Sequence, residues 1–226
     1  MVKVQKEHSH DESPNSTFLL LIVISIFTAI RITLLLTSQL SLHGDEAQYW
    51  SWSQDLNWGY FTKPPLIAWV IHVTTLLFGN AEWAVRLSSP ILHAGTSFAC
   101  ALIAKEIFGK KVYLWAGITF LTLPAVSFSS FLISTDVPLL FFWSIALYAM
   151  LQILKTRHLS WAILLGIALG LGLLSKYAMC YFLICSLLAC GLIQKHRWFL
   201  KSYHGLISIL IALAIFAPNI YWNFNF

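Results

Sequence analysis

Apolar runs separated by short charged segments constrain the fold of this chain more than any other feature. A helix needs roughly 20 mainly apolar residues to cross the hydrocarbon core of a bilayer. Only 10% of the residues are charged and the mean hydropathy is +0.75, whereas about 25% charge is usual in globular proteins. The sequence therefore predicts an all-α, polytopic transmembrane helical bundle. About seven spans are expected, at residues 18–36, 87–103, 112–133, 137–154, 161–174, 177–193 and 203–217, with Pro218 ending the last.

The first run follows a polar, charged leader, residues 1–16, and no small-residue cleavage site follows it. We therefore expect it to remain in the mature chain as an anchor. A further apolar segment, 66–78, is short for a span and typical of an interfacial or re-entrant helix. Whether this segment crosses the membrane decides on which side every later loop lies.

If segment 66–78 does not cross, one side of the membrane receives most of the basic residues. That side holds Lys3, Lys6, Lys105, Lys110, Lys111, Lys155, Arg157, Lys195, Arg197 and Lys201. The other side holds Lys63, Arg86 and Lys176 with the acids Asp45, Glu46, Asp55, Glu82 and Asp136. By the positive-inside rule the lysine-rich side is cytoplasmic, and an eighth span would scatter the bases over both sides. We expect a cytoplasmic amino terminus and a first loop on the outer face.

The outer face then carries groups suited to group transfer. Lysines bind phosphate readily, and a carboxylate can accept a proton from an attacking hydroxyl or amine. The candidate residues are the acids Asp45, Glu46 and Asp136 and the bases Lys63 and Lys176. Each also has a plainer interpretation. A lone interfacial lysine can snorkel to the headgroups, a loop acid can be merely solvated, and Asp136 can serve as a helix N-cap.

Aromatic residues gather in the same region, where Trp50, Trp52, Trp58, Trp69 and Trp83 accompany Tyr49 and Tyr60. An aromatic belt at the headgroup level explains most of them, although Tyr49, Trp50 and Tyr60 are candidates for contact with a sugar or lipid.

Other features have simpler expected roles. Arg31, inside the first apolar run, should snorkel or pair within the membrane. Gly166 and Gly170 form a GxxxG step that favours close helix packing. The four cysteines lack metal or redox spacing, and the bases are too dispersed for a nucleic-acid partner.

Four motifs in order resemble the polytopic glycosyltransferases that use polyprenyl-phosphate sugars, which include lipid A aminoarabinose transferases and protein O-mannosyltransferases. The motifs are DEAQYW at 45–50, YFTKPPL at 60–66, STDVPL at 134–139 and GLLSKY at 172–177. PNIYWNF at 218–224 also resembles a segment of bacterial members. The resemblance covers nearly the whole chain.

This resemblance implies the C-type glycosyltransferase fold and transfer on the outer face with inversion at the anomeric carbon. Asp45 matches the candidate catalytic carboxylate, with Glu46 beside it, and Asp136 matches a second acidic site. Lys63 and Lys176 match residues that contact the donor phosphate. The chain has Thr62 and Gln48 where aminoarabinose transferases often have charged residues, and this departure argues against copying their metal site or substrate choice. A divalent metal stays an open alternative, and no other cofactor is implied.

We therefore interpret the chain as a bacterial inner-membrane glycosyltransferase with a periplasmic active site. Its partners would be a polyprenyl-phosphate sugar donor, a lipid or protein acceptor such as lipid A or another envelope glycan, and membrane lipids. Residues 1–226 would form one transmembrane domain, the amino-terminal part of a longer family architecture. Two alternatives remain: a transporter or flippase of a lipid-linked sugar, and a non-catalytic, truncated membrane subunit.

Overall fold

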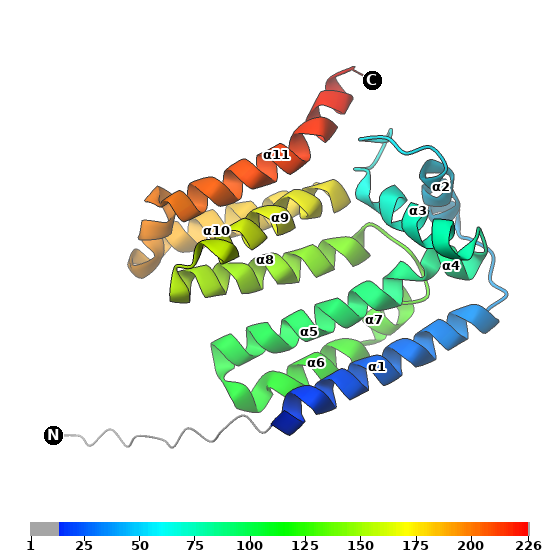
Figure 1. Ribbon diagram of the computed structural model, residues 1–226, viewed down its shortest axis with the longest axis horizontal. Helices are drawn as coiled ribbons and strands as arrows, with labels where there is room; N and C mark the ends of the chain where they lie inside the picture. Colours follow the sequence, from blue (N-terminus) through cyan, green and yellow to red (C-terminus); the bar gives the residue numbers. More distant parts are fainter. Residues whose placement is uncertain (1–13, 226) are drawn as a thin grey trace.

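The computed structural model describes residues 14–225, in which all regular elements are helical, as predicted (Figure 1). The elements are α1 (Pro14–Thr37), α2 (Gly44–Ser53), α3 (Leu66–Phe78), α4 (Glu82–Arg86), α5 (Ser88–Phe108), η1 (Lys110–Val112), α6 (Tyr113–Thr122), α7 (Pro124–Ser129), α8 (Asp136–Thr156), α9 (Leu159–Ser175), α10 (Met179–Leu192), η2 (Gln194–Lys201) and α11 (Tyr203–Asn225). Most of the expected leader, with Lys3 and Lys6, lies outside the described residues.

Four helices in the described part of the chain are long and apolar enough to cross a membrane. They cover Ser16–Thr37, Glu82–Phe108, Asp136–Thr156 and Tyr203–Asn225. Helices α3, α9 and α10 are apolar but shorter. The structure thus supports four of the expected spans by length and composition, and the total of seven stays a prediction.

The predicted span 112–133 is wrong as a single helix, because the structure divides it into α6 and α7. Between them Leu123 has a ψ of 130°, since a following proline disfavours the helical conformation of the residue before it. The break leaves carbonyls at the end of α6 without helical partners. Arg31 of α1 donates from Nη2 to the carbonyl of Leu121 at 2.6 Å and is only 4% exposed. Arg31 is therefore buried against the break, where it is hydrogen-bonded to the backbone of α6.

The expected end of the last span at Pro218 is also wrong, because α11 continues through this proline to Asn225. A proline inside a helix removes one backbone hydrogen bond and bends the helix, and Figure 1 shows α11 bending toward its carboxyl end. Tertiary contacts favour the extra turns. The side chain of Asn219 is fully buried, and the amide of Asn223 donates to the carbonyl of Asn219 at 2.8 Å.

Helix α9 packs closely against α11 through two glycines four residues apart. A Cβ at Gly166 would lie 2.7 Å from the carbonyl oxygen of Ser208, and one at Gly170 would lie 2.7 Å from Cβ of Ile215. Neither position has room for a side chain, which confirms the packing interpretation of the GxxxG step. Ser208 adds a hydrogen bond from its hydroxyl to the carbonyl of Ala162 at 2.8 Å.

The segments that carry most of the charged residues lie at the two ends of the bundle (Figure 1). The basic end comprises the α5–α6 and α8–α9 connections and η2, and it carries Lys105, Lys110, Lys111, Lys155, Arg157, Lys195, Arg197 and Lys201. The polar end comprises residues 38–87 with the first residues of α8 and the last of α9, and it carries Lys63, Arg86, Lys176, Asp45, Glu46, Asp55, Glu82 and Asp136. This division agrees with the one that the sequence predicts. Which end faces the cytoplasm stays a prediction.

Candidate functional site

The structure brings Asp136 and Lys176 together at the polar end. Asp136 is the first residue of α8 and Lys176 follows the last residue of α9, so the antiparallel pair of helices places both side chains at one end. Nζ of Lys176 lies 2.7 Å from Oδ1 of Asp136, and the two side chains are 36% and 57% exposed. Such an open ion pair adds at most about 1 kcal/mol to stability. Thr135 occupies the N-cap position, so the N-cap interpretation of Asp136 is wrong.

Asp45 faces the same region from helix α2. It lies in the first turn of α2 and is exposed, and no hydrogen bond or ion pair with another residue in 14–225 engages its carboxylate. Tyr49 follows one turn later and is only 3% exposed. Burial raises the pKa of the Tyr49 hydroxyl, and the negative charges of Asp45 and Asp136 raise this pKa further. The two carboxylates therefore act on one hydroxyl from two different elements.

Glu46, beside Asp45, is buried in an ion pair with Arg86. Nε and Nη2 of Arg86 donate to Oε1 and Oε2 of Glu46 at 2.8 Å and 2.6 Å, and both side chains are 3% exposed. The backbone N–H groups of His43 and Ile133 also donate to this carboxylate, each at 2.9 Å. Arg86 in turn donates to the carbonyls of Leu40 and Ser41, each at 2.9 Å. Both charged side chains, Glu46 and Arg86, therefore have several hydrogen-bond partners.

The contacts of Glu46 hold the pKa of its carboxylate below the ordinary value despite burial. Burial alone would raise the pKa, but the hydrogen bonds from Arg86, His43 and Ile133 and the charge of Arg86 outweigh it, so the pKa lies below its ordinary value. Sequence reasoning counted Arg86 among the outer bases without giving it a role. Its position just before a long apolar run, with few other bases near it, was the available signal.

Lys63 lies in a tight turn that leads into α3. The N–H of Tyr60 donates to the carbonyl of Lys63 at 3.1 Å, and the N–H of Lys63 donates back to Tyr60 at 3.3 Å. The buried prolines Pro64 and Pro65 follow and stiffen the chain before Leu66. Lys63 is half-buried, and its ammonium has no hydrogen-bond or ion-pair partner in the described part of the chain. The N–H donors of this ammonium at the polar end are therefore available to a ligand.

Two of the three aromatic candidates support the loop rather than face open space. Tyr60 stacks on Trp52 with ring centroids 4.8 Å apart, and its hydroxyl lies 2.9 Å from the carbonyl of Trp52 and 3.1 Å from the N–H of Asn57. Tyr49 lies in a buried apolar cluster with residues of α3 and α4. Trp50 is half-buried, and its indole N–H donates to Oδ1 of Asn80 at 3.1 Å. Their contact with a sugar or lipid stays a prediction.

Sequence reasoning missed the role of Asn219 in joining three distant segments. Its Nδ2 donates to the carbonyl of Trp58 at 2.6 Å, and the hydroxyl of Tyr177, next to Lys176, lies 3.2 Å from its Oδ1. The nearby Gly59 leaves room for Trp222, because a Cβ there would lie 2.3 Å from the indole ring. Residues 58 and 59, which immediately precede motif 60–66, therefore meet motifs 172–177 and 218–224 at the polar end. The signal in the sequence was the resemblance of 218–224.

Within residues 14–225, no three His, Cys, Asp or Glu residues are grouped so that they could hold a metal ion. The polar end does pair the Asp136 carboxylate with Lys176 and sets Asp45 and Asp136 near the buried Tyr49, and it also carries Lys63. These groups are suited to proton acceptance and to binding an anion such as phosphate.

Comparisons with known proteins match most of the chain. The profile of a family described as dolichyl-phosphate-mannose-protein mannosyltransferase matches residues 62–222. The lipid A galacturonosyltransferase RgtD of Rhizobium johnstonii is 39% identical over 90% of this chain and 43% of its own length. An undecaprenyl phosphate-alpha-4-amino-4-deoxy-L-arabinose arabinosyl transferase of Pseudomonas paraeruginosa is 25% identical over 74% of this chain and 33% of its own length.

Among solved structures, ArnT from Cupriavidus metallidurans in the apo state superposes with a TM-score of 0.70. The sequence identity is 20%, and the match covers 93% of this chain and 42% of that one. This likeness shows a shared helical fold. The chain spans less than half the length of the relatives that it matches.

Proposed function

This chain belongs to the dolichyl-phosphate-mannose-protein mannosyltransferase family, and from that premise we propose that it moves a sugar from a polyprenyl-phosphate donor to an acceptor at a membrane surface. The observation that carries the proposal is the pairing of Asp136 with Lys176 at the polar end, where both Asp136 and Asp45 act on the Tyr49 hydroxyl. The turn that carries Lys63 lies at the same end, so acids and bases from four separate segments are available there for group transfer.

In the proposed reaction, a hydroxyl or amine of the acceptor attacks the anomeric carbon of the donor sugar. The bond from that carbon to the phosphate oxygen breaks, and polyprenyl phosphate leaves with the electron pair. Asp45 accepts the proton of the attacking group because its carboxylate is exposed and has no described partner. Lys63 and Lys176 stabilise the charge that develops on the leaving phosphate.

Glu46 and Asp136 take different parts in this proposal. Glu46 is saturated by Arg86 and two backbone N–H groups, so it positions Asp45 and does not touch substrate. Asp136 is exposed and paired with Lys176, so it orients this lysine until the donor phosphate arrives.

The proposed setting is a bacterial inner membrane crossed by seven spans, with the basic end cytoplasmic and the polar end periplasmic. The eight described bases at the basic end support this orientation. Helix α3 then lies at the outer surface. The name of RgtD, a lipid A galacturonosyltransferase, favours lipid A or another envelope lipid as the acceptor over a protein. The name of the arabinosyl transferase favours an undecaprenyl-phosphate donor.

The test measures release of labelled sugar from polyprenyl-phosphate donors by membranes that contain this chain. Asp45→Asn should abolish release at equal expression, whereas Asp55→Asn, a change of another exposed acid in the same loop, should leave it intact. Release that does not depend on Asp45, or no release from any such donor, contradicts the proposal. Movement of the donor across the membrane without cleavage would instead indicate a flippase.

A further inference from the structure

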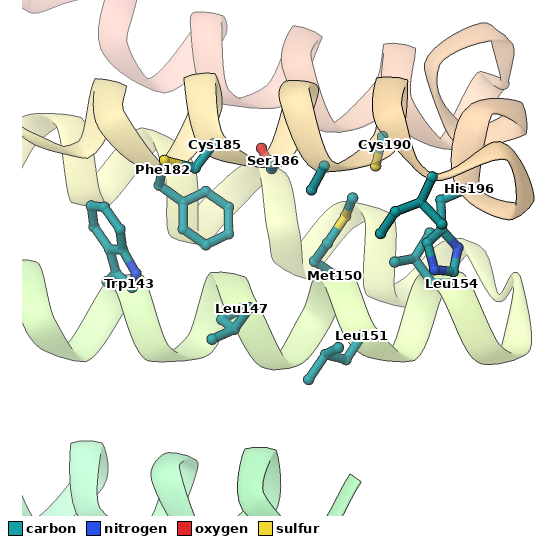
Figure 2. Close-up of a pocket in the computed structure, with 12 residues that line it drawn as sticks. Trp143, Leu147, Met150, Leu151, Leu154, Phe182, Cys185, Ser186, Cys190 and His196 are labelled. Carbon is teal, nitrogen blue, oxygen red and sulfur yellow. The ribbon is translucent and has the colours of Figure 1, made fainter. Parts of the chain in front are cut away.

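A groove with an apolar lining lies between α8 and α10, away from the polar end (Figure 2). Its volume is about 380 Å³, and it runs from Trp143 to Leu154 along α8, ending beside His196 of η2. Eleven residues of helix rise about 16 Å, which is roughly half the ~30 Å hydrocarbon core of a bilayer. The groove therefore has the depth of one leaflet.

The end of the groove at η2 is rich in positive charge. Lys195 and Arg197 flank His196 and are exposed, and the guanidinium carbon of Arg157 lies 4.3 Å from the centroid of the Trp198 ring. No Asp or Glu follows residue 136 in the sequence, and Glu106, which lies at the same end, is paired with Lys155. Basic pockets between helices at a membrane surface attract anionic lipid headgroups.

His196 supplies a second, independent observation. It lines the end of the groove, and its Nδ1 is buried without a hydrogen-bond partner among the described residues. A buried polar nitrogen without a partner is destabilising, so a turn of the imidazole that brings Nδ1 to a ligand oxygen in the groove would relieve it. Figure 2 shows the imidazole beside Leu154, where an acyl chain in the groove would meet its headgroup.

We propose that the α8–α10 groove binds an acyl chain of an anionic phospholipid from the leaflet at the basic end. Lys195 and Arg197 bind the phosphate, and His196 donates to a phosphate or ester oxygen. The one-leaflet depth fits a phospholipid chain and is too short for a polyprenyl chain. This site is separate from the sugar-transfer site, so its test does not depend on the proposed function.

The first experiment measures binding of phosphatidylglycerol and of phosphatidylcholine with the same acyl chains to the purified 226-residue protein by native mass spectrometry. Phosphatidylglycerol should bind more tightly. Lys195→Gln and Arg197→Gln should each weaken its binding about fivefold, with phosphatidylcholine unaffected. Lys110→Gln and Lys111→Gln are matched controls, because these lysines are exposed at the same end outside the groove. Equal losses in the controls, or equal binding of both lipids, would overturn the proposal.

The second experiment places the acyl chain with a phosphatidylglycerol that carries a photoreactive group on its tail. Crosslinks should map to α8 and α10, and Ser186→Phe should reduce them severalfold by filling the groove. Leu187→Phe is the control, since Leu187 is 49% exposed and does not line the groove. Unchanged crosslinking in Ser186→Phe, with a thermal midpoint equal to that of the unaltered protein, contradicts the placement. Polyprenyl phosphate should not displace the probe at a lower concentration than phosphatidylglycerol does. If it does, the groove binds a polyprenyl chain and the proposal is wrong.

Discussion

The backbone N–H of Ile133 donates a hydrogen bond to Oε1 of Glu46 at 2.9 Å, although the residues lie 87 positions apart. Glu46 adjoins Asp45 in α2, and Ile133 precedes the turn that leads to Asp136 at the start of α8. This bond therefore fixes the two exposed carboxylates of the candidate site relative to each other. Arg86 completes the link by neutralising Glu46 where both side chains are buried.

Removing Arg86 should destabilise the protein strongly. Arg86→Ala leaves the Glu46 carboxylate buried without its counter-ion, and breaking a buried ion pair in this way costs about 3–5 kcal/mol. We expect a marked fall in the thermal midpoint of the purified protein in detergent. The control is Lys155→Ala, which breaks the pair of an exposed lysine with Glu106 and should cost less than about 1 kcal/mol. Equal losses in the two variants would contradict a structural role for the buried pair.

The same pair should make stability depend on acid pH. Because the folded state lowers the pKa of Glu46, its stabilising contribution is complete above the unfolded value of about 4.3. It is lost as the pH falls through the lower, folded pKa. The difference in thermal midpoint between the unaltered protein and Glu46→Gln should therefore be constant near neutrality and shrink in stronger acid. If this difference in thermal midpoint stays constant down to denaturing acid, Glu46 stabilises the protein through packing and not through its charge.

Much of the helical architecture followed from the sequence, because apolar runs bounded by charge report directly on helices in a membrane. Segment 66–78 forms a helix with these same limits, and α8 lies within two residues of its expected span. Both errors in the predicted spans concern proline. Pro124 divides an apolar run that hydropathy alone reads as one span, whereas Pro218 is held inside α11 by contacts of Asn219 that no local pattern reveals.

The candidate site was predictable in its members but not in their contacts. Topology placed Asp136 and Lys176 on one face, and the structure pairs them. Topology could not tell which of Asp45 and Glu46 is buried. Adjacent residues on a helix point about 100° apart, and tertiary packing alone decides which of them faces the interior. The partners that bury Glu46 are Arg86 and the N–H of Ile133, both far away in the sequence.

Gly59 should be sensitive to the smallest substitution. A Cβ there would lie 2.3 Å from the indole of Trp222, so Gly59→Ala should displace α11 from the loop that carries Lys63. We expect a lower thermal midpoint and weaker donor binding. Gly44→Ala is the matched control, because a Cβ at Gly44 meets nothing within 4 Å. If both variants keep the parent stability and donor affinity, the contact between α11 and this loop does not position Lys63.

The two lysines should contribute differently to donor binding, because within residues 14–225 Lys176 has a charged partner and Lys63 has none. Lys63→Ala removes a free ammonium, and loss of a hydrogen bond to a charged group should weaken donor binding between about tenfold and a hundredfold. Lys176→Ala also leaves the Asp136 carboxylate unpaired beside the phosphate. The two negative charges repel each other, so Lys176→Ala should weaken donor binding more than Lys63→Ala does.

A double-mutant cycle with Asp136→Asn tests this difference. Asp136→Asn removes the repelling charge, so donor affinity in the double variant with Lys176→Ala should exceed that of Lys176→Ala alone. Combining Asp136→Asn with Lys63→Ala serves as the control, because Lys63 has no described contact with Asp136. Stability should change by less than about 1 kcal/mol in all of these variants, since the ion pair is exposed. If Asp136→Asn fails to restore affinity to Lys176→Ala, the carboxylate does not oppose the donor phosphate, and Asp136 acts on the acceptor instead.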